Sequence, residues 1–292
     1  MDGLINKSGS PGTEDAKGAV VAGSGKKWLI GCGVGCGAVI LLGILLSVGG
    51  SIFMMRPFTE AIDVQKDLVA AYGEREAYIP PPQGITSDRI EAFFVVRQAV
   101  MPMCEKFRKI GESFAAMDEL DKGGEEPSKG EVFKVLGNLS GDIFGMVGNM
   151  GRFTKMRNQA LLDQGMGLGE YIWIYVLVFN SWQGYLPNRD IDGDSKGGMS
   201  ASERKVMRTL VLNHAEALAS AGMVEKAALW EKEAGRMKRN ETGVPFKNRE
   251  LPAGLIRAFL PFESKLQSLY CEATSSFEMN RIRKKGLSIH SE

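Results

Sequence analysis

The stretch KKWLIGCGVGCGAVILLGILLSVGGSIFMMR, residues 26–56, decides how the chain is organised. No charged residue occurs between Trp28 and Met55. About 20 apolar helical residues cross a bilayer core, whereas the apolar part of a secretory signal is about 7–15 residues long and lies near the N-terminus. This run is longer and follows a polar tail, so we expect residues 28–55 to form a permanent transmembrane helix.

Glycine spacing within this run indicates how the helix could self-associate. Gly31 and Gly35 are four positions apart, and small residues at that spacing let a second membrane helix approach closely. The alternative is that glycine is simply frequent in membrane helices. We keep self-association through Gly31 and Gly35 as one of two interpretations.

Basic residues on the two sides of the run predict its orientation. Lys26 and Lys27 directly precede it, whereas Arg56 and Lys66 are the basic residues that follow most closely. Lysine and arginine are enriched in cytoplasmic flanks, so we expect the N-terminus in the cytoplasm. Residues 1–27, rich in Gly, Ser and charge, then form a disordered cytoplasmic tail. The rest lies outside the cytoplasm, which is the periplasm in a Gram-negative bacterium.

After the span, apolar residues recur at helical spacing and no segment alternates with period two. We therefore predict an all-α protein, with a juxtamembrane helix and Pro-rich connector over residues 56–87 and a helical domain over residues 88–292. In detail, we expect Gly73 to end the first helix, Ser87 to begin the next, and a last helix to run from Ala253 past Pro261.

The charge balance argues against nucleic acid as a partner. The chain has 36 Lys and Arg against 35 Asp and Glu, for a formal net charge of +1. Nucleic-acid-binding domains usually carry a basic surplus on one face. We expect no nucleic-acid binding.

The helix predicted from Ser87 carries two unusual residues. Arg97 falls on its apolar stripe, and the two interpretations are a buried arginine that grips a ligand and one that lies along the edge of the stripe with its head in water. An arginine at the edge of the stripe, with its head group in water, is the more common arrangement. Pro102 lies within the same pattern and should kink or divide the helix.

A later helical segment contains a strip of glycines at Gly137, Gly141, Gly145 and Gly148. Each glycine inside a helix costs about 1 kcal/mol relative to alanine. The strip therefore forms a groove for a closely packed partner helix, or the segment is broken into shorter pieces.

The most apolar segment after the span is LGEYIWIYVLVFNSWQGY, residues 168–185. A helix that is apolar on nearly every side is buried in a core. We predict that its aromatic residues pack in the core and do not form a ligand-binding box; they are Tyr171, Trp173, Tyr175, Phe179 and Trp182.

One stretch has metal-binding character. Asn188, Asp190 and Asp192 match the first three ligand positions of an EF-hand loop, but Met199 replaces the bidentate glutamate at the twelfth position. A polar turn is the default interpretation, with calcium as the alternative and no other cofactor expected. Ser200 and Glu203 have the spacing of a capping box for the helix that follows.

The inventory of catalytic residues is small. The chain contains two histidines, of which His214 is expected on a helix surface. The sequence has no phosphate-binding loop, HExxH or CxxC motif. A carboxylate pair such as Asp163 with Glu170 remains open, because glycosidase pairs have no fixed spacing in sequence.

Two cysteines, Cys104 and Cys271, lie outside the predicted span. In an oxidising compartment such a pair can form a disulfide if the Cα atoms lie within about 7 Å of each other. The alternative is two separate buried thiols.

Two functions remain for the domain. The first is a non-enzymatic scaffold or protein-interaction module near the membrane, with a protein partner that the sequence does not identify. The second is an extracytoplasmic enzyme or small-molecule binder with a site between helices near Glu170, Tyr171 and Tyr175. A cavity of about 300 Å³ or more with convergent polar groups would favour the second function.

Overall fold

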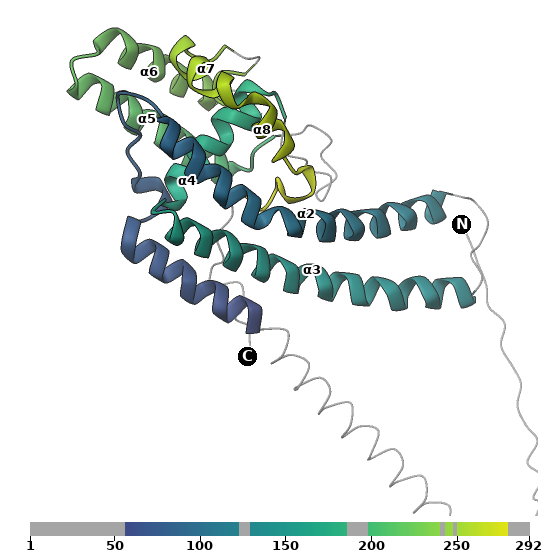
Figure 1. Ribbon diagram of the computed structural model, residues 1–292. Coiled ribbons are helices and arrows are strands. Elements are labelled where there is room, and N and C mark those ends of the chain that lie inside the picture. The colour runs from purple at the N-terminus through teal and green to yellow at the C-terminus, as the bar shows by residue number, and fades with distance from the viewer. Residues whose placement is uncertain (1–55, 123–128, 186–197, 240–242, 248–249, 280–292) are drawn as a thin grey trace, which may run out of the picture. The chain divides into compact units, whose positions relative to one another are not determined.

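The computed structural model describes residues 56–122, 129–185, 198–239, 243–247 and 250–279, and all regular structure in them is helical (Figure 1). The all-α prediction is confirmed for this part of the chain. No helix of these residues is long and apolar enough to cross a membrane. The predicted tail, the predicted span over 28–55 with Gly31 and Gly35, and the candidate calcium ligands Asn188, Asp190 and Asp192 lie outside the described residues.

The first described helix spans residues 56–72. The elements that follow it are η1 (Arg75–Ala77), α2 (Ser87–Lys122), α3 (Lys129–Asp163), α4 (Leu168–Tyr175), the π-helix η2 (Val176–Trp182), α5 (Ala201–Ser220), α6 (Val224–Arg239), α7 (Ala253–Phe259), η4 (Leu260–Phe262), α8 (Glu263–Ser268) and η5 (Glu272–Thr274).

Several predicted boundaries are confirmed. Gly73 has a φ of 75° and follows the first helix, α2 begins at Ser87, and Ser200 and Glu203 form the predicted capping box. The expected continuous helix past Pro261 is wrong. Pro261 lies in the short 3-10 helix η4, because proline has no N–H to donate to the preceding turn of an α-helix.

The two longest helices, α2 and α3, lie side by side (Figure 1). Pro102 lies inside α2 without dividing it, and the ribbon of α2 changes direction partway along its length. α3 runs unbroken through its glycines, so the interpretation that this segment is broken into pieces is wrong.

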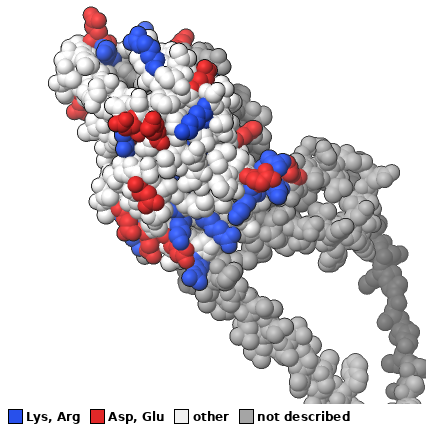
Figure 2. Space-filling view, viewed as in Figure 1, with Lys and Arg blue, Asp and Glu red and all other residues white. Residues whose placement is uncertain are grey.

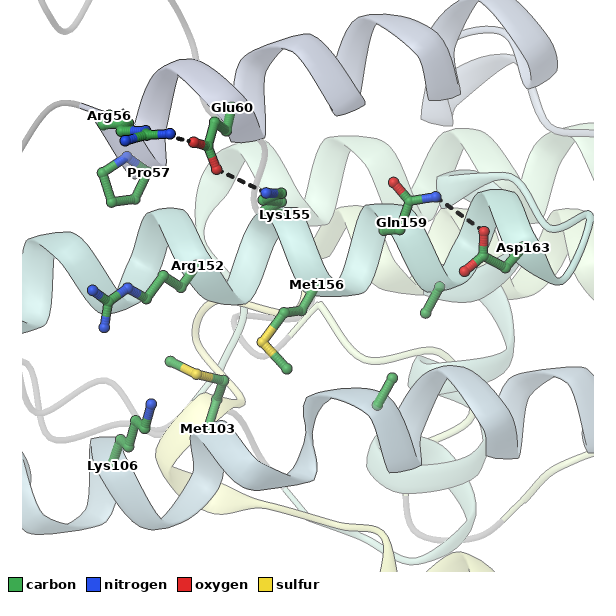
Figure 3. A pocket seen from close by; sticks show the side chains of 12 residues that line it. Arg56, Pro57, Glu60, Met103, Lys106, Arg152, Lys155, Met156, Gln159 and Asp163 are labelled. Atoms are coloured by element: carbon green, nitrogen blue, oxygen red, sulfur yellow. Dashed lines mark hydrogen bonds and ion pairs between the residues drawn. The ribbon is translucent and has the colours of Figure 1, made fainter.

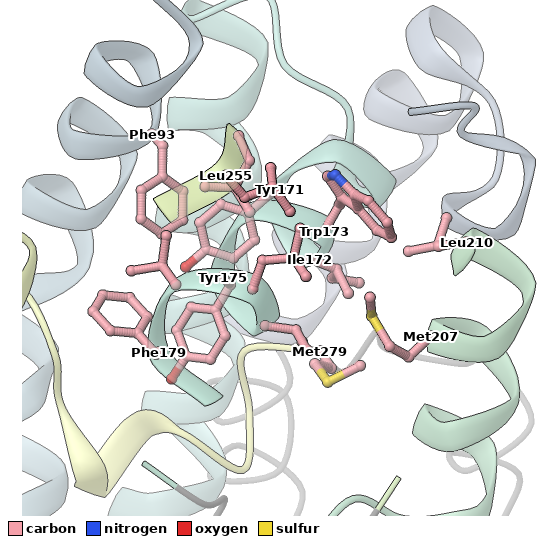
Figure 4. Packing of buried hydrophobic residues seen from close by; sticks show 14 of the residues in the cluster. Phe93, Tyr171, Ile172, Trp173, Tyr175, Phe179, Met207, Leu210, Leu255 and Met279 are labelled. Atoms are coloured by element: carbon pink, nitrogen blue, oxygen red, sulfur yellow. The ribbon is translucent and has the colours of Figure 1, made fainter. Parts of the chain in front are cut away.

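α4 and η2 form the centre of the core, as predicted. Every residue from Tyr171 to Trp182 is buried. Figure 4 shows Tyr171, Tyr175 and Phe179 on the side that faces Phe93 of α2, whereas Trp173 points toward α5. The residues that were expected to pack in the core therefore do so on two sides of one helix.

Glycines bring the first helix and the connector close to this core. A Cβ on Gly167 would lie 2.9 Å from the Cβ of Tyr72, and one on Gly169 would overlap the carbonyl oxygen of Arg75 and the Cβ of Tyr78. A Cβ on Gly151 of α3 would lie 3.0 Å from the carbonyl carbon of Pro57. These contacts place the start of the first helix directly against α3.

Candidate functional site

Arg97 is fully buried, and each of its three guanidinium nitrogens donates at least one hydrogen bond. Its guanidinium forms an ion pair with Glu278, donates to the hydroxyl of Tyr171 at 3.1 Å, and donates twice to the carbonyl oxygen of Leu269 at 3.1 and 2.8 Å. Burial has the largest single effect on the pKa of Arg97 and lowers it, but Glu278, Tyr171 and Tyr175 together raise it by more, so that the pKa is raised overall. The expectation of a head group in water is wrong, because Glu278, distant in sequence, supplies the countercharge.

Two further buried arginines hold the same C-terminal segment. Arg157 donates to the carbonyl oxygen of Glu278 at 2.7 Å, and Arg75 donates to that of Met279. Burial lowers the pKa of Arg157. We call Arg75, Arg97, Arg157 and Glu278 the C-terminal clasp. Its partners are protein groups, so its role is to fix residues 269–279 against the core.

The structure also joins Cys104 of α2 to Cys271 in a disulfide, with an S–S distance of 2.05 Å and Cα atoms 6.0 Å apart. Cys271 directly precedes η5. The disulfide therefore ties to α2 the same segment that the C-terminal clasp holds.

His214 is buried, so its predicted place on a helix surface is wrong. Its ring centroid lies 5.3 Å from that of Trp173 and 4.6 Å from that of Trp230, and its Nδ1 is 3.2 Å from the carbonyl oxygen of Pro80. The Pro-rich connector covers this face of α5. The sequence of α5 alone does not reveal this contact. Burial lowers the pKa of His214. Among the described residues, no side chain is hydrogen-bonded to its ring.

Glu170 lies beside a hollow of about 360 Å³ that includes Tyr78, Gln83, Thr86 and Arg89 among its lining residues. Arg89 binds both carboxylate oxygens of Glu170, at 2.6 and 2.7 Å. Burial raises the pKa of Tyr78 strongly, and the nearby charge of Glu170 raises it further.

The structure separates the residues that the sequence grouped around Glu170. Tyr171 donates to Glu278 at 2.6 Å inside the core, and Tyr175 is buried beside it. Asp163, the candidate carboxylate partner of Glu170, lines a different hollow. Glu170 is thus the one member of the predicted groups that faces this cavity.

The second hollow has a volume of about 660 Å³ and lies between the helix over 56–72, α2 and α3. We call it the basic trough. Twelve residues line it: Arg56, Pro57, Glu60, Ala99, Met103, Lys106, Arg152, Lys155, Met156, Gln159, Ala160 and Asp163. Figure 3 shows Arg152 and Met156 reaching from α3 toward α2, and Met103 and Lys106 reaching back from α2.

The carboxylates of the basic trough are already engaged. Glu60 accepts from Lys155 at 2.7 Å and from Arg56 at 3.0 Å, and these hydrogen bonds, that of Lys155 foremost, lower the pKa of Glu60. Asp163 accepts from Gln159 at 3.0 Å.

The sequence contains one signal for the basic trough. Arg152 and Lys155 are three positions apart and share one face of α3. The basic residues from the other helices join them only through tertiary packing.

Elsewhere, acidic and basic side chains are interspersed on the face shown in Figure 2. Within the described part of the chain, no group of three or more His, Cys, Asp or Glu residues is placed to hold a metal ion. No known protein family matches the chain, and no curated protein or solved structure is significantly similar to it.

Proposed function

We propose that the chain is a single-pass membrane protein with its N-terminus in the cytoplasm, and that its helical domain holds a partner protein outside the cytoplasm. The uncharged run from Trp28 to Met55 and the flanking Lys26 and Lys27 support the anchor and its orientation. The disulfide supports an extracytoplasmic location, because disulfides persist mainly in oxidising compartments.

The observation that carries the interaction role is the open face of α3 at Gly145 and Gly148. A Cβ at either position would meet nothing within 4 Å. Each glycine costs about 1 kcal/mol of helix stability, and at these two positions no close neighbour within the described chain requires the loss. Gly151, one turn further on, is the contrast, because Pro57 packs directly against it. A helix of another protein could lie as close to Gly145 and Gly148 as the first helix lies to Gly151.

Site-specific photo-crosslinking in membranes of the native host tests this role. A photoreactive amino acid replaces Gly148 in one variant and Gly254 in the control. A Cβ on Gly254, in α7, also meets nothing within 4 Å. We expect a protein adduct from position 148 and none from position 254. Equal labelling at both positions, or no adduct from position 148, contradicts the interaction role.

Reporter fusions after residue 292 test the topology separately. A reporter that is active only outside the cytoplasm is expected to work there. Activity of a reporter that works only in the cytoplasm contradicts the proposed orientation.

The hollow beside Glu170 favours a second candidate function, small-molecule binding. Its volume of about 360 Å³ and the polar side chains of Gln83 and Thr86 in a mainly apolar lining support this function, whereas the pairing of Glu170 with Arg89 leaves fewer groups for a ligand. Mass spectrometry of the purified full chain would detect a retained molecule, which Thr86→Trp should displace and Thr209→Trp, on α5, should not. A preparation that retains none contradicts this function.

A further inference from the structure

The basic trough has a local surplus of positive charge. Four basic residues and two carboxylates line it. Arg56 and Lys155 share the single carboxylate of Glu60. Within the described ranges, Lys106 and Arg152 form no ion pair, and both are exposed. As far as the described part of the chain shows, the trough therefore offers an anion two cations that have no ion-pair partner.

The trough is also apolar between its charges. Met103 and Met156 lie between α2 and α3 (Figure 3). Ala99 and Ala160 also line the trough; Met103 and Ala160 are buried, whereas Ala99 and Met156 are partly exposed. Methionine side chains are flexible and polarisable, so they adapt to apolar chains of different shape. An occupant that matches both features has an anionic group next to a hydrocarbon segment.

The position of the trough in the chain indicates where such an occupant would come from. Arg56 and Pro57 line the trough and directly follow the uncharged run that ends at Met55. If that run spans the bilayer, Arg56 lies at the membrane surface, where basic residues attract anionic lipids.

We propose that the basic trough binds an anionic phospholipid of the anchoring membrane, with its phosphate near Lys106 and Arg152 and the start of an acyl chain against Ala99 and Met156. This inference rests on the proposed membrane anchor and does not depend on a protein partner. An acidic peptide would use the cations but would leave the partly exposed Ala99 and Met156 without an apolar counterpart, which is why we favour the lipid.

Native mass spectrometry of the full chain in non-ionic detergent tests the proposal. The chain is titrated with dioctanoyl phosphatidylglycerol, which is anionic, and with dioctanoyl phosphatidylcholine, which is zwitterionic. We expect saturable binding of the first and weaker binding of the second. The Lys106→Gln/Arg152→Gln variant should bind the anionic lipid about 25-fold more weakly, since each basic residue near a lipid surface contributes about fivefold.

The matched control is Lys232→Gln/Arg257→Gln, which removes the same charges from exposed positions on α6 and α7. It should bind the anionic lipid as the wild type does. Ala99→Phe fills part of the trough without a change of charge and should also weaken binding, with unfolding curves as the check on folding.

Three results would overturn the proposal. They are equal binding of the two lipids, equal loss in the trough variant and the control, and binding of a glutamate-rich peptide in place of the lipid. Failure here is distinguishable from failure of the proposed function, because lipid binding in detergent is independent of crosslinking at position 148 and of the reporter after residue 292.

Discussion

The Arg97–Glu278 pair allows a quantitative prediction about stability. Both side chains are completely buried, and the Glu278 carboxylate also accepts hydrogen bonds from Tyr171 at 2.6 Å and Thr274 at 2.8 Å. Glu278→Gln retains the shape of the side chain but leaves Arg97 without its countercharge. Removal of one partner of a buried pair costs about 3–5 kcal/mol, a large part of the 5–15 kcal/mol that typically stabilises a domain.

The partner substitution, Arg97→Met, should also be strongly destabilising, because it leaves the buried carboxylate of Glu278 without its ion-pair partner. The double variant should cost less than the sum of the two, by about 1–3 kcal/mol, because neither charge remains unpaired.

Urea denaturation of the oxidised full chain in detergent, followed by tryptophan fluorescence, measures these free energies of unfolding. Trp173, Trp182 and Trp230 are buried and report on the core. Glu112→Gln, which removes an exposed partner of Arg108, is the control and should have no measurable effect. A loss of less than about 1 kcal/mol for Glu278→Gln, or strict additivity in the double variant, would refute the reasoning.

Three further predictions follow from the same structure. Because burial lowers the pKa of His214, the folded state should lose stability as the pH falls below the ordinary histidine pKa of about 6.5. The melting temperature should therefore decrease between pH 7.5 and 5.5, and His214→Gln should make this decrease smaller. An unchanged pH dependence in the variant contradicts this. Gly169→Ala should cost about 1–3 kcal/mol through overlap with the connector, whereas Gly254→Ala, in open space, should be neutral or stabilising in the same urea assay. Cys271→Ser should cost about 2–5 kcal/mol, and dithiothreitol should lower the melting temperature of the wild type but not of the variant.

Local features were predictable from the sequence. Helical spacing of apolar residues, the capping box of Ser200 and Glu203, and the start of α2 at Ser87 depend on interactions within a few positions of the chain. The burial of residues 171–182 was predictable for the same reason, since a helix that is apolar on every side has no face to present to water.

The places where the prediction was wrong depend on partners far away in the chain. Arg97 is buried because Glu278 faces it, 181 positions later, and His214 is buried because the connector around Pro80 covers it, 134 positions earlier. The sequence of a helix predicts that a polar residue on it is exposed, because the distant segment that supplies a countercharge or a carbonyl oxygen is not part of that helix.

The sequence by itself determined that the described part of this protein is helical and which helix lies at its centre, because hydrophobic periodicity and capping act locally. Only the tertiary structure decided which arginines are buried, which cysteines are bonded, and where the basic trough lies. The trough joins Glu60 to Lys155, 95 positions apart, through the close contact of Pro57 with Gly151. Such contacts depend on how separate helices pack, and the pattern of any one helix does not contain that information.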